Sequence, residues 1–426
     1  MDIQVGAIGA LLGLLLSIIL IFKNVKPFYA LFVGALVGGL IGGASLVETV
    51  GLMTQGSMGM VTAILRILAA GILAGVLIKS GAAESIAYSI VKLLGQNRAM
   101  LALILSTMIL TLVGVFIDIS IITVAPIAIE VAKKAGYSRT SVLIAMIGGG
   151  KVGNLMSPNP NTISVSDAFE VPLTNVMLAG LVPAVFGIII TYIIANRLIQ
   201  KGTFFTDDGA ESVEEAIEET NTDQLPSLIK SLAGPIVAIV LLSLRPIAGI
   251  EIDPMIALPI GGVIGAVVMG KAKNVIEYSN YGMDKMVGVA IILLGTGLIA
   301  GIISNSTLGE VLVNAVDTLG LPVYLLAPLS GILMSAATAS TTSGSAVASA
   351  VFSQTIVGAG VSPLNGAVMV HSGATVLDHL PHGSFFHATA GSVQMQFKER
   401  LGLIGYETLI GLVLTIVTTI VFGLII

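Results

Sequence analysis

Long apolar stretches recur along the whole chain and are separated by short polar or charged segments. A helix needs roughly 20 residues to cross a bilayer, and these stretches have about that length. They lie at 4–22, 27–45, 58–78, 99–117, 174–196, 228–244, 252–270, 284–303, 321–335 and 403–426. Because backbone groups in lipid must be satisfied within the segment, the pattern predicts an all-α polytopic membrane protein.

The composition agrees with the pattern. Hydrophobic residues make up 55% of the chain and charged residues 10%, with a mean hydropathy of +1.02, whereas soluble domains carry roughly 25% charged residues. No Lys or Arg precedes Lys23 and no small-x-small site ends the first stretch, so we expect that stretch to remain as a helix. The chain has no cysteine, which excludes disulfide, iron–sulfur and thiol chemistry.

A strongly acidic segment at 201–226 divides the chain almost in half. Its acidic residues are Asp207, Asp208, Glu211, Glu214, Glu215, Glu218, Glu219 and Asp223. Blocks of like charge are typical of solvated linkers. We therefore predict membrane halves at 1–200 and 227–426 joined by a soluble linker, with a regulatory or partner-binding role of the linker as the alternative.

The two halves resemble each other. Aligning residues 135–138 with 359–362 places Gly149 on Gly373 and Asn154 on Asp378, and residues 71–75 fall on 297–301 at nearly the same offset. Internal duplication is typical of transporters. Our count gives six crossings in each half if the re-entrant segments described next do not cross the membrane, and an even number predicts parallel repeats.

One pair of matching segments is short and polar at its centre. The segments are 118–126, which begins at Asp118, and 335–345, which is rich in Ser and Thr. Unsatisfied hydroxyl groups cannot face lipid, so we predict that each is a re-entrant hairpin. The alternative is a Ser/Thr-rich helix that packs tightly against its neighbours.

The second matching pair contains strong helix breakers. Residues 148–162 include three consecutive glycines and a Pro-Asn-Pro element, and residues 371–387 contain all four histidines, Pro381 and Gly383. Proline removes a helix donor and clashes with the preceding turn, so each segment is predicted to be a broken transmembrane helix. The freed amides favour an anion and the freed carbonyls a cation. A plain extramembrane loop is the alternative.

The charges in these segments are the candidates for proton handling. A carboxylate at membrane depth beside imidazoles can titrate near neutral pH, which favours Asp378 with His379 and His382. A zinc site formed by His379, His382 and His387 is a competing interpretation. Simple capping of the broken helices by the histidines is the third.

Two cations also stand out. Lys151 lies where the second half has Thr375, so it could replace a coupling ion or pair with a substrate carboxylate; snorkelling to the interface is the alternative. Arg66 is the charge inside its predicted span. A structural pair with a carboxylate such as Asp118 is the favoured interpretation, and contact with an anion is the alternative. Asp167 is interpreted as a surface residue.

At these motifs the chain resembles the gluconate permease (GntP) family of proton-coupled symporters, within the ion transporter superfamily. The resemblance covers most of the chain: residues 71–81, 118–126, the element 157–162, and above all 371–384. It implies two inverted repeats, each with a re-entrant hairpin and a broken helix, and substrates such as gluconate, glycerate or hydroxybutyrate-type acids. It also implies a homodimer. Asn159 and Asn161 depart from the histidine and glycine expected in gluconate carriers, so the resemblance does not specify the substrate.

We therefore expect a multi-pass protein of the cell inner membrane that imports a small hydroxy-carboxylate by proton symport and alternating access, with Na⁺ as the alternative coupling ion and no cofactor, metal or nucleic acid. The candidate substrate-binding residues are Ser157, Asn159, Asn161, Thr162, Lys151, Thr341, Thr342, Ser343, His371 and Ser384. The candidate proton-coupling residues are Asp378, His379, His382 and Asp118. A cation/proton antiporter is the alternative function, and an intramembrane enzyme is a weaker one.

Overall fold

The computed structural model describes residues 4–23, 25–95, 98–205, 225–318, 320 and 322–425. Over these residues the chain is helical, and its β-structure is limited to the isolated bridges Val5–Ser306 and Ser138–Phe204. The all-α prediction is confirmed. Most of the acidic segment lies outside the described residues, so the division at 201–226 stays a prediction.

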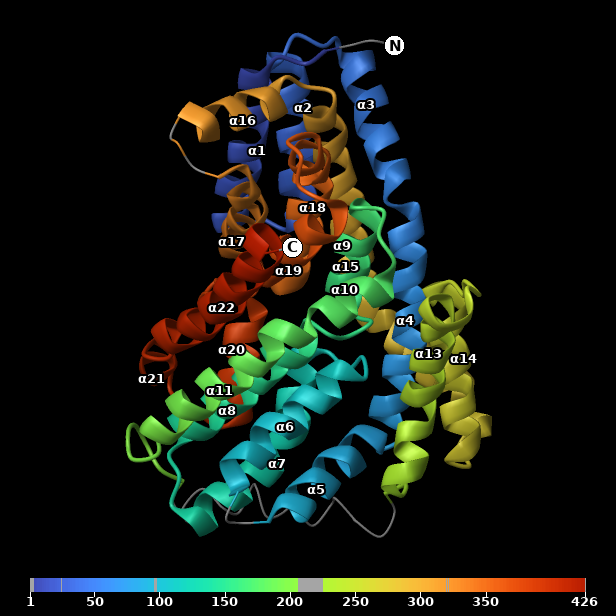
Figure 1. Cartoon of the computed structure of the whole chain (residues 1–426), viewed down its shortest axis with the longest axis vertical. Coiled ribbons are helices and arrows are strands. Elements are labelled where there is room, and N and C mark those ends of the chain that lie inside the picture. Colours follow the sequence, from blue (N-terminus) through green and yellow to red (C-terminus); the bar gives the residue numbers. More distant parts are fainter. Residues whose placement is uncertain are drawn as a thin grey trace.

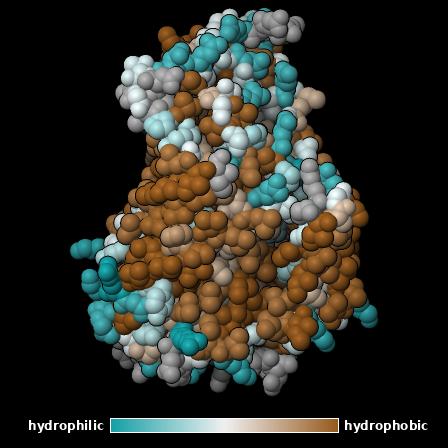
Figure 2. All heavy atoms as spheres, in the orientation of Figure 1, coloured by the Kyte–Doolittle hydropathy of each residue, from teal (hydrophilic) through white to brown (hydrophobic). Residues whose placement is uncertain are grey.

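Every predicted apolar stretch coincides with an apolar helix. Four helical segments are long and apolar enough to cross a membrane: Val61–Lys79, Leu173–Arg197, Ala272–Ser304 and Phe397–Ile425. Six shorter apolar segments are Ala7–Phe22, Pro27–Ile41, Ala99–Leu112, Leu228–Leu244, Pro254–Val268 and Val323–Thr338. Figure 2 shows a broad apolar surface across the middle of one face with polar residues toward its two ends, as a membrane protein requires.

The helices of the first half follow one another as shown in Figure 1. They are α1 (Ala7–Phe22), α2 (Pro27–Ile41), α3 (Leu46–Gly59), α4 (Val61–Lys79), α5 (Ala82–Leu94), α6 (Ala99–Leu112), α7 (Ile117–Ala135), α8 (Arg139–Asn154), α9 (Pro160–Ala168), α10 (Leu173–Ala179) and α11 (Leu181–Arg197).

The second half has the same order of elements. They are α13 (Leu228–Ala248), α14 (Pro254–Val268), α15 (Val275–Ser304), α16 (Leu308–Thr318), α17 (Leu326–Thr338), α18 (Thr341–Gly358), α19 (Pro363–Gly373), α20 (Ser384–Ser392), α21 (Phe397–Leu401) and α22 (Ile404–Thr419). In each half two apolar helices precede a long helical segment, a short helix, a pair of helices joined by a tight turn, an interrupted helix and a final apolar helix. The spatial relation of the halves as repeats stays a prediction.

Each half contains a helical hairpin, α6–α7 or α17–α18. The first turns at residues 113–116, ahead of the predicted 118–126, because Asp118 already lies in the first turn of α7 and that helix continues past Pro126. The second turns at Ala339, which has a left-handed φ of 46°, and Ser340 then caps α18. The stretches 99–117 and 321–335, counted above as crossings, thus contain first arms of hairpins. If each hairpin returns to the side it entered, α1, α2, α4, α8–α9 and α11 remain, an odd number that favours inverted repeats; the inversion itself stays a prediction.

The long helices α4 and α15 are held together by glycine contacts. A Cβ added at Gly282 would lie 1.8 Å from the Gly71 carbonyl oxygen, and one at Gly75 would lie 2.1 Å from the Tyr278 carbonyl oxygen. Small residues allow helix backbones to approach closely in membranes, where packing drives association. The glycines therefore fix α15 against α4, and α14 packs on the same helix.

Candidate functional site

Both predicted helix interruptions are present. The first separates α8, which ends at Asn154, from α9, which begins at Pro160. The Asn159 side chain restarts the helix: its Oδ1 accepts hydrogen bonds from the amides of Asn161 and Thr162 at 2.9 and 3.1 Å. Its amide nitrogen donates to the Asn154 carbonyl at 3.0 Å, across the break. Asn159 is thus committed to backbone groups, as an N-cap should be.

The second interruption, residues 374–383, lies against the tip of a hairpin. A Cβ added at Gly383, the residue before α20, would lie 2.5 Å from the carbonyl oxygen of Ala339, where α17–α18 turns. His382 Nε2 lies 3.2 Å from the Ala337 carbonyl at the end of α17. The hairpin and the broken helix of the second half therefore meet at their polar ends.

The two halves also interlock. Helix α18 packs against α9, and α20 packs against α7, so each hairpin contacts the broken helix of the other half. Figure 1 shows α9, α18 and α19 together near the centre of the molecule. This exchange of contacts brings the two interruptions into one buried region.

A buried ion pair joins the halves in that region. The ammonium of Lys151, on α8, contacts the carboxylate of Asp378 and donates to the Thr375 carbonyl at 2.5 Å. Its distance to His379 Nδ1 is 3.2 Å. The other oxygen of Asp378 accepts from the Thr341 hydroxyl at 2.5 Å, at the start of α18. Both charged side chains are almost completely buried, so Lys151 has an internal partner and does not snorkel.

The geometry around His379 assigns its tautomer. Nε2 lies 3.1 Å from the Ile404 carbonyl, which can only accept, so Nε2 carries a hydrogen. Thr408 Oγ1 is 3.2 Å from the same nitrogen. Nδ1 lies 3.0 Å from Asp378 Oδ1. In a neutral ring this nitrogen accepts a hydrogen bond from the Lys151 ammonium, and in a protonated ring it donates one to Asp378.

A second buried pair, which was not predicted from the sequence, lies beside His379. Arg400 binds both oxygens of Glu407, with Nη2 to Oε2 at 3.1 Å, and both side chains are completely buried. Arg400 also donates to the Thr389 hydroxyl at 3.3 Å and lies 4.6 Å above the Phe386 ring. Glu407 Oε2 is 4.0 Å from His379 Nδ1.

A signal for this pair was present in the sequence. Glu407 falls inside the predicted span 403–426, and an ionisable residue within an apolar span marks a functional or paired position. Its partner is only seven residues away, in a segment whose pattern predicted no helix.

The other candidate binding residues differ in how deeply they are buried and in whether they have hydrogen-bond partners. Buried polar atoms with no hydrogen-bond partner among the described residues include Ser157 Oγ, Asn161 Oδ1 and His371 Nε2. Thr162 and Ser343 are buried, Thr342 is half-buried and Ser384 is exposed. Asp118 accepts a hydrogen bond from the neighbouring Ile119 amide at 2.9 Å, and in the described part of the chain no contact joins it to Asp378.

The histidines predicted as a possible zinc site do not converge. His382 faces the Ala337 carbonyl, and His387 Nε2 lies 2.8 Å from the Pro381 carbonyl, whereas His379 faces Asp378. Within the described residues no group of three metal-ligating side chains is close enough to hold a metal ion.

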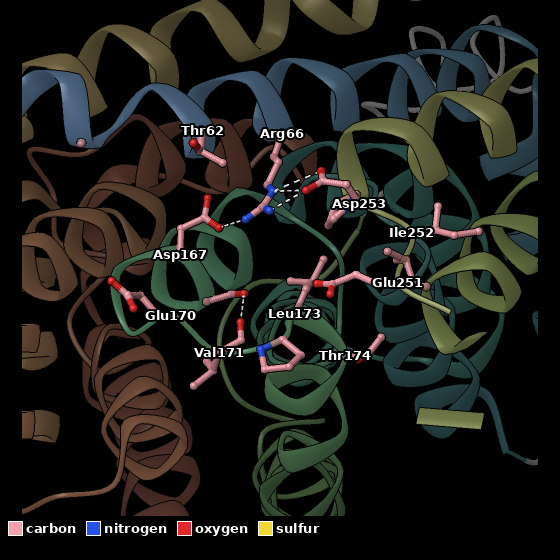
Figure 3. A pocket seen from close by; sticks show the side chains of 15 residues that line it. Thr62, Arg66, Asp167, Glu170, Val171, Leu173, Thr174, Glu251, Ile252 and Asp253 are labelled. Atoms are coloured by element: carbon pink, nitrogen blue, oxygen red, sulfur yellow. Dashed lines mark hydrogen bonds and ion pairs between the residues drawn. The ribbon is translucent and has the colours of Figure 1, made fainter. Parts of the chain in front are cut away.

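Arg66 has partners other than the predicted one. Its guanidinium, on α4, contacts Asp167 at the end of α9 and binds Asp253 before α14, with Nε to Oδ2 at 3.1 Å (Figure 3). The proposed pair with Asp118 is therefore wrong, and Asp167, whose side chain is 15% exposed, is not a surface residue. These three side chains and Glu170 line a cavity of about 350 Å³.

Asp253 lies outside the helices and has two roles in this cluster. It caps α14 by accepting from the Met255 amide at 2.8 Å. Burial raises the pKa of the Asp253 carboxyl, but the hydrogen bonds from Arg66 and from that amide outweigh burial and hold the pKa below its ordinary value.

Apolar helices, two interruptions that meet in the interior, and a buried ion pair at their junction together define an integral membrane transporter. Comparison with known proteins gives the family. The chain belongs to the GntP family of permeases, whose family model matches residues 3–425. It is thus a multi-pass inner-membrane permease and not an enzyme.

Full-length relatives support this assignment. The chain is 58% identical over 419 residues to an uncharacterized transporter of Haemophilus influenzae, covering 98% of both chains. It is 21% identical to a high-affinity gluconate transporter of Escherichia coli, covering 97% of both. Among solved structures, the YdaH transporter of Alcanivorax borkumensis matches with a TM-score of 0.57 at 16% identity, over 88% of this chain and 86% of the other, and so shares the fold.

Proposed function

We propose that this permease imports gluconate or a related small hydroxy-carboxylate together with protons, by alternating access. The observation that carries the proposal is the buried junction of Lys151, Asp378 and His379 between the two interrupted helices. This junction contains side chains that can exchange a proton, and it lies in a buried region enclosed by both halves of the chain. The gluconate transporter among the relatives supports a hydroxy-acid substrate.

The unpartnered polar atoms supply the contacts that a hydroxy acid needs. Ser157 Oγ and Asn161 Oδ1 are buried beside the first interruption and have no hydrogen-bond partner within the part of the chain that the structure describes. Leaving a buried polar atom unpaired costs about 1–3 kcal/mol. Substrate hydroxyl groups would satisfy them. The amides that begin α20, which no side chain caps, would receive the carboxylate, because helix N-termini favour anions. We also propose a homodimer without a cofactor, with H⁺ as the coupling ion and Na⁺ as the alternative.

The proposal is tested by uptake of labelled gluconate into proteoliposomes that contain the purified protein. An imposed inward proton gradient should drive accumulation that collapses when the gradient is dissipated, and unlabelled glycerate or 3-hydroxybutyrate should compete. Uptake driven by an inward Na⁺ gradient, without a proton gradient, tests Na⁺ as the alternative coupling ion. Absence of uptake and competition, with proton flux that follows Na⁺ alone, would instead identify a cation/proton antiporter.

Asp378→Asn tests the coupling role directly. Because an amide cannot exchange the proton, we expect gradient-driven accumulation to fall by about 100-fold or more, in the range of a lost general acid–base group. Glu130→Gln is the matched control, since Glu130 is half-exposed and pairs with Lys134 at the end of α7. Proton-driven accumulation at the wild-type level in Asp378→Asn would contradict the assignment.

A further inference from the structure

The Arg400–Glu407 pair is buried at a cost that packing alone does not explain. Both side chains have 0% exposure, and Arg400 Nε has no hydrogen-bond partner among the described residues. Removing two charges from water costs several kcal/mol per ion even after relaxation, and well-packed apolar residues commonly serve equally well. A charge retained at such a position in a membrane helix points to function.

The position of the pair beside His379 indicates which function this is. Glu407 Oε2 and Asp378 Oδ1 both face the same atom, His379 Nδ1, at 4.0 and 3.0 Å. The opposite nitrogen of the ring is held by the Ile404 carbonyl on α22, the helix that carries Glu407. Two carboxylates therefore face the same edge of the His379 ring: Asp378, from its own interruption, within hydrogen-bond distance, and Glu407, from α22, just beyond it.

The charges of this cluster balance without an added proton. Lys151 from α8 and Arg400 from α21 contribute two positive charges, and Asp378 and Glu407 contribute two negative ones. With a neutral His379 the sum is zero. One proton taken up at the cluster leaves it with a single positive charge, next to the region proposed to receive an organic anion. Release of that proton restores the balance.

We infer that Glu407, held by Arg400, is a positioning residue for proton coupling: it fixes His379 against Asp378 and makes the two buried ion pairs exchange the proton as one unit. The inference rests on the proposed proton symport. Arg400 also joins α20 to α22, since it contacts Thr389 and Phe386 on α20. A change of charge at His379 is thereby transmitted to the second half of the broken helix.

The test measures the pH at which gluconate uptake into proteoliposomes is half-maximal. Glu407→Gln removes one negative charge that stabilises a proton bound in the cluster. Half-maximal uptake should therefore require about tenfold higher proton concentration. Glu407→Asp keeps the charge and should return the profile toward that of the wild type. At saturating proton concentration the KM for gluconate should change less than the pH profile, because Glu407 does not touch the proposed substrate contacts.

Two further variants separate positioning from folding. Replacing both Arg400 and Glu407 by Gln removes the pair without an uncompensated charge and should fold, yet should also lose the wild-type profile. Glu399→Gln is the matched control, because Glu399 lies on the same helix as Arg400 but bonds Thr140 and Thr203 outside the cluster. Its profile should remain unchanged.

The outcomes are distinct. A wild-type protein without proton-dependent uptake would overturn the proposed function, and this inference with it. Wild-type proton dependence with an unshifted profile in Glu407→Gln and in the double variant would overturn the inference alone, whatever the loss of rate. Failure of the double variant and of Glu407→Asp to fold would assign the pair a purely structural role and overturn it equally.

Discussion

Lys151 forms a buried ion pair that links the two halves of the chain. Its side chain comes from α8, and its partners Asp378 and the Thr375 carbonyl belong to the interruption after α19. The sequence identified Lys151 and Asp378 separately as candidates, because charges in apolar segments are conspicuous. It did not pair them, because a contact between residues 227 positions apart depends on how the helices pack.

The pair predicts a non-additive effect on stability. Lys151→Gln leaves Asp378 buried without its counter-charge and should cost about 3–5 kcal/mol, whereas combining it with Asp378→Asn should recover most of that loss. Thermal unfolding of the purified variants in one detergent measures both. Lys134→Gln, at the exposed pair with Glu130, should cost under about 1 kcal/mol. Equal losses in the single and double variants would show that the pair is not the source of the effect.

At the scale of elements, apolar patterning predicted the helices well and their local ends less well. The interruption at 155–159 followed from Pro160 and the glycines before it, which are local signals. The turn of the first hairpin did not, because Pro126 lies inside α7 where a break was expected. A proline within a membrane helix is tolerated when its neighbours satisfy the freed backbone groups, and sequence alone does not show those neighbours.

The α4–α15 contact gives a prediction at this scale. Gly282→Val should destabilise the protein by about 1–3 kcal/mol or more, because the new side chain would overlap the backbone of α4. Gly288→Val, on the same helix, is the control, since nothing lies within 4 Å of a Cβ added there. Thermal unfolding and the yield of membrane-inserted protein compare the two. A Gly282 variant as stable as the Gly288 variant would contradict the close packing of these helices.

For the whole molecule, the cluster at Arg66 connects three distant parts of the chain. Arg66 is 101 residues from Asp167 and 187 from Asp253, so no local pattern could have assigned these partners. The sequence thus predicted the membrane class, the apolar helices and the two interruptions, all of which have local signals. The ion pairs among α4, α9 and the start of α14, and the pair beside His379, arise from tertiary packing.

This cluster is expected to affect both the approach of an anion and stability. Arg66→Gln removes a positive charge from a cavity that also contains Asp167, Glu170 and Asp253, so the KM for gluconate should rise several-fold at low salt and less at high salt. Because Arg66→Gln leaves the mostly buried Asp167 carboxylate without its counter-charge, it should also cost about 1–3 kcal/mol of stability. Arg98→Gln, at an exposed position before α6, is the control. A salt-independent KM in Arg66→Gln would contradict this role.

The ion pair between the halves also sets an order for biosynthesis. Lys151 enters the membrane 227 residues before Asp378 has been synthesised. Until then the first half contains an ammonium group without its counter-charge, so it cannot complete its interior while the ribosome is still translating the second half. We therefore expect an N-terminal fragment that ends before Asp378 to be degraded faster by membrane proteases than the full chain.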